Sequence, residues 1–101
     1  MSKRLDPNVR ADALLQTALR VAEVKGWRAM TRECIAVAAG VSPGLVSARL
    51  GTMAAVRRQV MRAAVRQRVV TVVAEGLLFG DAHARRADAE LRQAAAEHVC
   101  R

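Results

Sequence analysis

Apolar positions recur at helical spacing along most of this 101-residue chain. The first such run extends from residue 9 to about Lys25 and predicts a helix with a broad buried stripe. The stripe consists of Val9, Ala13, Leu15, Ala18, Leu19 and Ala22. Gly26 is expected to end this helix, and Trp27 to anchor it in the core. We expect residues 1–8 to form a flexible basic arm, in which Asp6 or Asn8 caps the helix.

The stretch from residue 31 to residue 50 has the pattern of two short helices joined by a tight turn. Thr31 is an N-cap residue type, and Gly40 suits the left-handed conformation that ends a helix. Ser42 caps again, and Pro43 takes the first position of the next helix, where its missing N–H costs nothing. The positions expected to face inward are Ile35, Ala36, Ala39, Val41, Val46 and Leu50. The pattern predicts a helix-turn-helix, although an ordinary corner in an all-α core has the same signals.

After a break at residues 51–52, a long helix is predicted to begin near Met53. The β-branched residues 69–73 fit a helix or a strand, and we favour a helix because a lone strand would have no sheet to join. Residues 76–80 are an apolar segment that is expected to be bounded by turns at its two glycines. Asp81 is expected to cap a last helix over residues 82–99. Its weak apolar face consists of Ala84, Ala87, Leu91, Ala94 and Val99.

These patterns together predict an all-α fold. We expect a three-helix, helix-turn-helix head over residues 9–52, followed by a long basic helix and a short C-terminal helix. The core of the head must be built from aliphatic side chains, because Trp27 and Phe79 are the only aromatic residues. A chain of this size has a thin core, so we expect the helical extension over residues 53–101 to carry a dimer interface.

The positive charge is concentrated in the first four fifths of the chain. Residues 1–79 hold thirteen Lys and Arg against five Asp and Glu, whereas residues 80–101 hold four of each. Between Glu33 and Glu75 there is no acidic residue, but there are six arginines: Arg49, Arg57, Arg58, Arg62, Arg66 and Arg68. An electrostatic field from positive charges alone attracts a polyanion, and arginine binds phosphate through two parallel N–H donors.

The alternatives to a polyanion are a solvated basic face and an anionic membrane surface. A solvated face usually mixes both signs of charge, which this stretch does not. A membrane helix would need large apolar residues opposite its arginines. Here that face consists of Val56, Val60, Ala64 and Val69, which suit packing in a core. Nucleic acid is therefore favoured over lipid.

The sequence offers no grouping typical of catalysis or metal binding. It has no glycine-rich phosphate loop, no cluster of a histidine, a carboxylate and a nucleophile, and no metal-ligand spacing. Cys34 and Cys100 are expected to be reduced thiols, and His83 and His98 ordinary surface residues. No apolar run is long enough for a membrane span, and the first residues lack the apolar segment of a secretory signal. We expect a cytoplasmic protein without enzymatic activity, cofactor or metal.

The order of residues through the first two thirds of the chain resembles a known family. Gly26-Trp27 is followed by Thr31, Ile35-Ala36 and the run Ala39-Gly40-Val41-Ser42, then Gly44 and Val46. Over residues 9–65 this order resembles the N-terminal DNA-binding region of the TetR/AcrR family of bacterial transcriptional regulators. The resemblance implies that the third helix enters the major groove, and that homodimers bind palindromic operators in double-stranded DNA.

The chain also departs from the family pattern. Family members carry a larger C-terminal domain that binds an effector, whereas this chain has only the residues after about 68. No effector pocket is therefore expected. Ser47 and Leu50 stand where the family often has aromatic residues, and Met53 where it often has a lysine. These departures remove usual phosphate contacts, for which we expect Arg57 and Arg58 to compensate.

The remaining DNA contacts are assigned by position in the predicted motif. Residues near the start of its second helix are expected to approach base edges: Ser42, Pro43, Gly44, Leu45 and Ser47. Arg49 suits a guanine edge or a phosphate, while Thr31 and Arg32 suit a phosphate at the start of the preceding helix. Lys3 and Arg4 are candidates for a minor-groove contact.

These assignments predict a sequence-specific repressor that occludes a promoter, of the compact kind found on plasmids and phages. An activator has the same sequence features. Two further hypotheses remain open. One is a protein-interaction module, such as an anti-repressor or adaptor, which the residues at 47 and 53 favour. The other is a nonspecific binder of nucleic acid.

Overall fold

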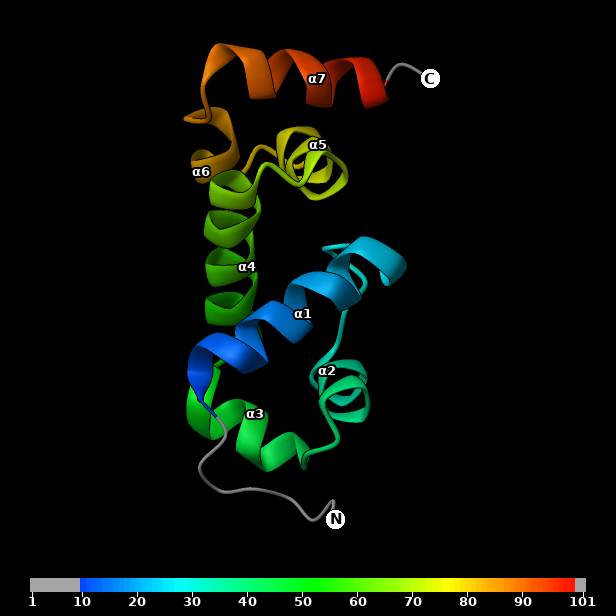
Figure 1. The fold of residues 1–101 in the computed structure, drawn as a ribbon, viewed down its shortest axis with the longest axis vertical. Helices are drawn as coiled ribbons and strands as arrows, with labels where there is room; N and C mark the ends of the chain where they lie inside the picture. Colours follow the sequence, from blue (N-terminus) through cyan, green and yellow to red (C-terminus); the bar gives the residue numbers. More distant parts are fainter. Residues whose placement is uncertain (1–9, 100–101) are drawn as a thin grey trace.

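A computed structural model describes residues 10–99, which contain seven helices and no strand (Figure 1). The helices are α1 (Ala11–Lys25), α2 (Arg32–Ala39), α3 (Pro43–Leu50), α4 (Met53–Gln67), α5 (Val70–Leu78), α6 (Ala82–Arg85) and α7 (Ala89–Val99). The molecule is elongated, with extents of 43 × 22 × 19 Å, and α3 lies at the end opposite α7 (Figure 1). The prediction of an all-α fold is confirmed for these residues.

Helix α1 buries a face that differs slightly from the predicted stripe. Ala18, Leu19 and Ala22 are buried as predicted, and Leu14 and Val21 join them. Ala13 is exposed and Leu15 is half-buried, because the buried face consists of Leu14 and the positions four, five, seven and eight residues after it. Helix α1 begins after Arg10, whose side chain makes no capping bond. The expected caps Asp6 and Asn8 lie outside the described residues, as do Val9 and the basic arm.

Trp27 ties the connection between α1 and α2 to the rest of the fold. Its side chain is buried, and its indole Nε1 donates to the carbonyl oxygen of Arg57 in α4 at 3.0 Å. The carboxylate of Glu75 in α5 accepts the backbone N–H of Trp27 at 2.7 Å and that of Arg28 at 3.0 Å. The expected role of Trp27 as a core anchor is confirmed.

The two short helices α2 and α3 have the predicted caps. The hydroxyl of Thr31 accepts the N–H of Cys34, and that of Ser42 accepts the N–H of Leu45, both at 3.1 Å. Gly40 has φ 71° and ψ 34°, the left-handed conformation expected of it. The chain turns by 104° between the two helices. The residues that hold the pair against the core are Ile35, Ala36, Val46 and Leu50, and all four are buried.

The long helix predicted from Met53 ends at Gln67. Arg68 adopts φ 58°, so the chain turns and residues 70–78 form a separate helix, α5. The preference for helix over strand at residues 69–73 is confirmed from Val70 onward. The turn expected at Gly76, before the apolar segment 76–80, is wrong, since Gly76 lies inside α5. A Cβ at Gly76 would collide with Met61 and lie 2.9 Å from the Cβ of Ala84, so glycine here permits close packing of α4, α5 and α6.

The single helix predicted over residues 82–99 is wrong. Asp81 caps the helix that starts at Ala82, as expected, and its carboxylate accepts the N–H of Ala84 at 2.9 Å. This helix, α6, already ends at Arg85. The carboxylate of Asp88 then accepts the N–H of Leu91 at 2.8 Å, as an N-cap of α7 would. Helix α7 packs on α5 and buries Leu91 and Ala95, while Val99, assigned to its apolar face, is 40% exposed.

Candidate nucleic-acid interface

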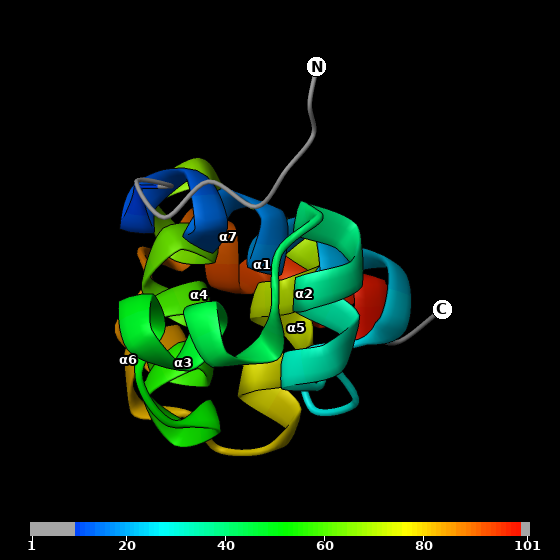
Figure 2. The same ribbon diagram turned by 90° about the horizontal axis from the view of Figure 1, so that it is seen from below.

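Helix α3 is held from one side and presents the other to solvent. Val46 and Leu50 are buried, whereas Pro43 and Gly44, in its first turn, are exposed. Figure 2 views the molecule from the end that carries α2 and α3, and the turn between these helices lies on the surface there. The predicted contact residues therefore divide by exposure. Pro43, Gly44 and Arg49 are exposed, while Ser42, Leu45 and Ser47 are half-buried.

The start of α2 presents a smaller polar surface than predicted. Thr31 is exposed, and its hydroxyl is used by the capping bond. Arg32 is half-buried, and its Nε atom is buried with no hydrogen-bond partner in the structure. Exposed Glu33 follows it in the first turn. A phosphate at this helix start would meet the free amides and Arg32, but also a carboxylate.

The arginines of α4 separate into two groups. Arg58, Arg62 and Arg66 are exposed along one stripe of the helix, as their spacing predicts. Arg57 is half-buried and, with Arg58, lines a hollow of about 320 Å³. The other residues that line this hollow are Trp27, Arg28, Ala54, Phe79 and Asp81. Arg57 and Arg58 thus come together with Arg28, which the sequence analysis missed because its neighbours in sequence carry no phosphate-binding pattern.

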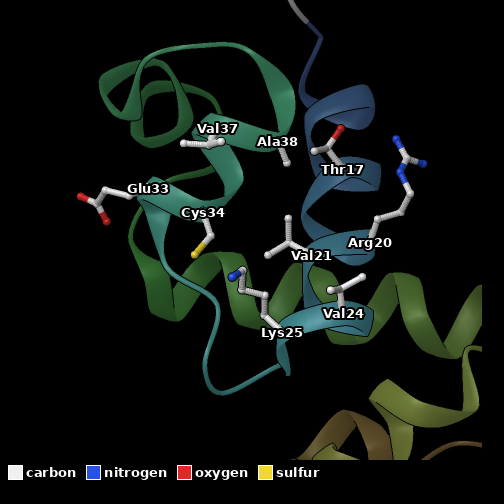
Figure 3. Close-up of a pocket in the computed structure, with 9 residues that line it drawn as sticks. All are labelled: Thr17, Arg20, Val21, Val24, Lys25, Glu33, Cys34, Val37 and Ala38. Atoms are coloured by element: carbon white, nitrogen blue, oxygen red, sulfur yellow. The ribbon is translucent and has the colours of Figure 1, made fainter.

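An apolar groove of about 560 Å³ lies between α1 and α2 (Figure 3). Val21 and Lys25 of α1 reach toward Cys34 and Ala38 of α2 (Figure 3). The remaining lining residues are Thr17, Arg20, Val24, Glu33 and Val37. Val24 and Val37 are 85% and 83% exposed. No effector pocket is expected from the sequence. The one sequence feature that points to this groove is the pair Val24 and Val37, which lie off the predicted apolar faces.

Cys34 lines this groove as a free thiol. Its sulfur lies 3.1 Å from the hydroxyl of Thr31, and this hydrogen bond lowers the pKa of the thiol. Cys100 lies outside the described residues. Of the two histidines, His83 is half-buried and His98 is exposed.

Within residues 10–99, no three His, Cys, Asp or Glu side chains gather in an arrangement that could hold a metal ion. In the same residues, no single helix is both long and apolar enough to cross a membrane; α2 and α3 reach that length only as a pair bent by 104°. Lys3 and Arg4, the candidates for a minor-groove contact, lie outside the described part of the chain. No known protein family matches the sequence, and neither does any curated protein or solved structure.

Proposed function

We propose that this chain is a sequence-specific DNA-binding transcriptional repressor of the TetR/AcrR type, with a shortened C-terminal part. It binds a palindromic operator as a homodimer and acts by occluding a promoter, without an effector. In this proposal α2 and α3 are a helix-turn-helix, and α3 is the helix that enters the major groove.

The observation that carries the proposal is the corner between α2 and α3. The turn of 104° around Gly40 falls in the range typical of helix-turn-helix motifs. The first turn of α3 is exposed at Pro43 and Gly44, while Val46 and Leu50 fix the other face of the helix. A duplex can therefore approach the start of α3 without displacing side chains from the core.

The charge of the surrounding chain supports DNA as the partner. No acidic residue separates Glu33 from Glu75, and the exposed arginines of this interval include Arg49, Arg58 and Arg62. Arginines that neutralise phosphates release counterions, so the affinity should fall steeply as the salt concentration rises. In a dimer, two α3 helices would read half-sites about 34 Å apart, one turn of the duplex.

The second candidate is a protein-interaction module built on the same head. Ser47 is half-buried at a position where a DNA contact is expected, and Met53 is half-buried at the start of α4 where the family often has a lysine. Both residues reduce the number of phosphate contacts that the head can make. They favour an adaptor that no longer binds DNA. A nonspecific nucleic-acid binder is the third candidate.

Selection of duplexes from a random pool distinguishes these candidates. The repressor should enrich one symmetric sequence, and sedimentation of the selected complex should give two chains per duplex. Equal retention of all sequences would indicate a nonspecific binder. No retention even at low salt would contradict the proposal and favour the interaction module.

Arg49→Ala tests the position of α3 on the selected duplex. If Arg49 contacts a base, binding should weaken by about 1–3 kcal/mol and specificity should relax at one position of the site. Arg86→Ala, at the exposed end of α6, is the matched control and should leave the affinity unchanged. Unchanged binding by Arg49→Ala would mean that α3 does not read the duplex as proposed.

A further inference from the structure

The hollow that contains Arg28, Arg57 and Arg58 gathers three positive side chains from two segments that are far apart in sequence. Arg28 follows α1, the other two lie in the second turn of α4, and Phe79 at the end of α5 completes the wall. In the described part of the chain none of these guanidiniums forms an ion pair with a carboxylate, whereas Arg10 and Arg68 both do.

The fold holds Arg28 and Arg57 in place through contacts with neighbouring groups. Glu75 accepts the backbone N–H of Arg28, and the indole of Trp27 donates to the carbonyl of Arg57. The guanidinium of Arg28 lies over the ring of Phe79, with its carbon 4.4 Å from the ring centre. Stacking fixes the plane of the guanidinium while its N–H groups, which point outward in that plane, remain able to donate.

The charges that face the hollow leave an excess of two positive charges. Asp81 is the acidic residue of its lining, and one carboxylate oxygen of Asp81 is occupied as the cap of α6, at 2.9 Å from the N of Ala84. Glu75 does not line the hollow, and its carboxylate accepts the two backbone N–H groups of residues 27 and 28. Like charges held close together are unfavourable unless an anion joins them.

We propose that this hollow is a phosphate-binding site, in which Arg28, Arg57 and Arg58 donate to the oxygens of one phosphate group. A phosphate suits the site because it carries enough charge and enough acceptor oxygens for several guanidiniums. The phosphate comes either from the DNA backbone beside α3, in which case the site rests on the proposed function, or from a free phosphorylated ligand such as a nucleotide.

The first arm of the test uses the fluorescence of Trp27, the chain's single tryptophan, which lines the hollow. The full chain is titrated with pyrophosphate and with adenosine triphosphate. If the ligand is free in solution, both should change the emission. Arg28→Ala and Arg58→Ala should each weaken binding by about tenfold, the loss expected for one charge-assisted hydrogen bond. Arg62→Ala, on the same helix but outside the hollow, is the matched control and should bind as well as the unchanged chain.

The second arm measures the affinity for the selected duplex against salt concentration. If the phosphate belongs to the DNA backbone, Arg28→Ala and Arg57→Ala should each reduce the salt slope by about one. Arg28→Lys keeps the charge but loses the stacked, two-pronged donor, so it should recover only part of the loss. Thermal unfolding of each variant checks that it is folded, as expected for changes to side chains that do not lie in the core.

The outcomes separate this inference from the proposed function. A response in either arm that depends on Arg28 supports the site, and a response to pyrophosphate alone does so even if the chain binds no DNA. The inference is overturned if Arg28→Ala leaves both arms unchanged while Arg49→Ala still weakens DNA binding. It is also overturned if Arg62→Ala weakens pyrophosphate binding as much as Arg28→Ala does, since the arginines would then act only as a diffuse positive field.

Discussion

Gly40 ends α2 and Arg68 ends α4, and the two corners use the same backbone hydrogen bonds. The N–H of Val41 donates to the carbonyl of Ala36 at 3.0 Å, and that of Val69 donates to the carbonyl of Ala64 at 2.8 Å. Both ending residues are left-handed, with φ 71° and φ 58°. Glycine adopts this conformation without strain, whereas a residue with a Cβ does not.

The difference lies in what holds each corner. At Gly40 an added Cβ would meet no atom within 4 Å, so this corner depends on the backbone preference of one residue. At Arg68 the side chain reaches Asp88 at 2.7 Å and Glu90 at 3.6 Å. The helix that follows, α5, is clamped between α4, α6 and α7. A local preference makes the first corner, and tertiary contacts impose the second.

The largest expected effect is at Gly76, where α5 packs after the second corner. Gly76→Ala should destabilise the fold by about 1–3 kcal/mol, because the methyl group would collide with Met61 and Ala84. Urea denaturation measures this loss. Met61→Ala shortens one colliding side chain, so the loss in the double variant should be smaller than the sum of the two single losses. Unchanged stability of Gly76→Ala would mean that α5 is not packed as closely as described.

Gly40→Ala should cost about 1–2 kcal/mol, because the alanine is forced into a left-handed conformation although its methyl group has room. The same measurement on Gly44→Ala provides the control within the same helix pair. Gly44 lies in α3, and a Cβ there would be 3.8 Å from the hydroxyl of Ser42, so alanine should be neutral or stabilising by up to about 1 kcal/mol. Equal effects of the two substitutions would contradict a left-handed Gly40.

A smaller effect on stability is expected at Arg68, where two substitutions separate the contribution of the backbone conformation from that of the side chain. Arg68→Ala and Arg68→Gly both lose the ion pair with Asp88, but only alanine keeps the left-handed strain. Thermal unfolding should therefore give a lower midpoint for the alanine variant than for the glycine variant. The reverse order would show that the second corner is not left-handed in solution.

The smallest expected effect is the pH dependence that Asp88 introduces. The hydrogen bond from Arg68 lowers the pKa of Asp88 from 3.8 to about 2. A lowered pKa in the folded state contributes stability above the usual pKa, and this contribution is lost as the pH falls from about 4 toward 2. Because the pair is exposed, the melting temperature should fall only modestly between those values. The fall should be smaller in Asp88→Asn, and a fall of the same size would exclude this ion pair as its source.

Much of the first half of the chain could be predicted because its signals are local. Thr31 and Ser42 cap helices through hydrogen bonds to residues three positions away, and Gly40 ends α2 by its own conformational freedom. These interactions depend on residue type and short spacing, which the sequence displays directly. The distribution of charge is equally a property of the sequence, since no folding is needed to count it.

The tertiary structure decided what depends on residues far apart in sequence. The corner at Arg68 carries no glycine signal and is held by Asp88, twenty positions later. The break after α6 follows from the same carboxylate, and the burial of Gly76 depends on Met61 and Ala84. The arginine hollow combines Arg28, whose backbone N–H is bound by Glu75, with two arginines that come about thirty positions later in the chain. Local hydrogen bonds and net charge were determined by the sequence alone. Long-range packing determined where the chain turns between its later helices and which arginines line the same hollow.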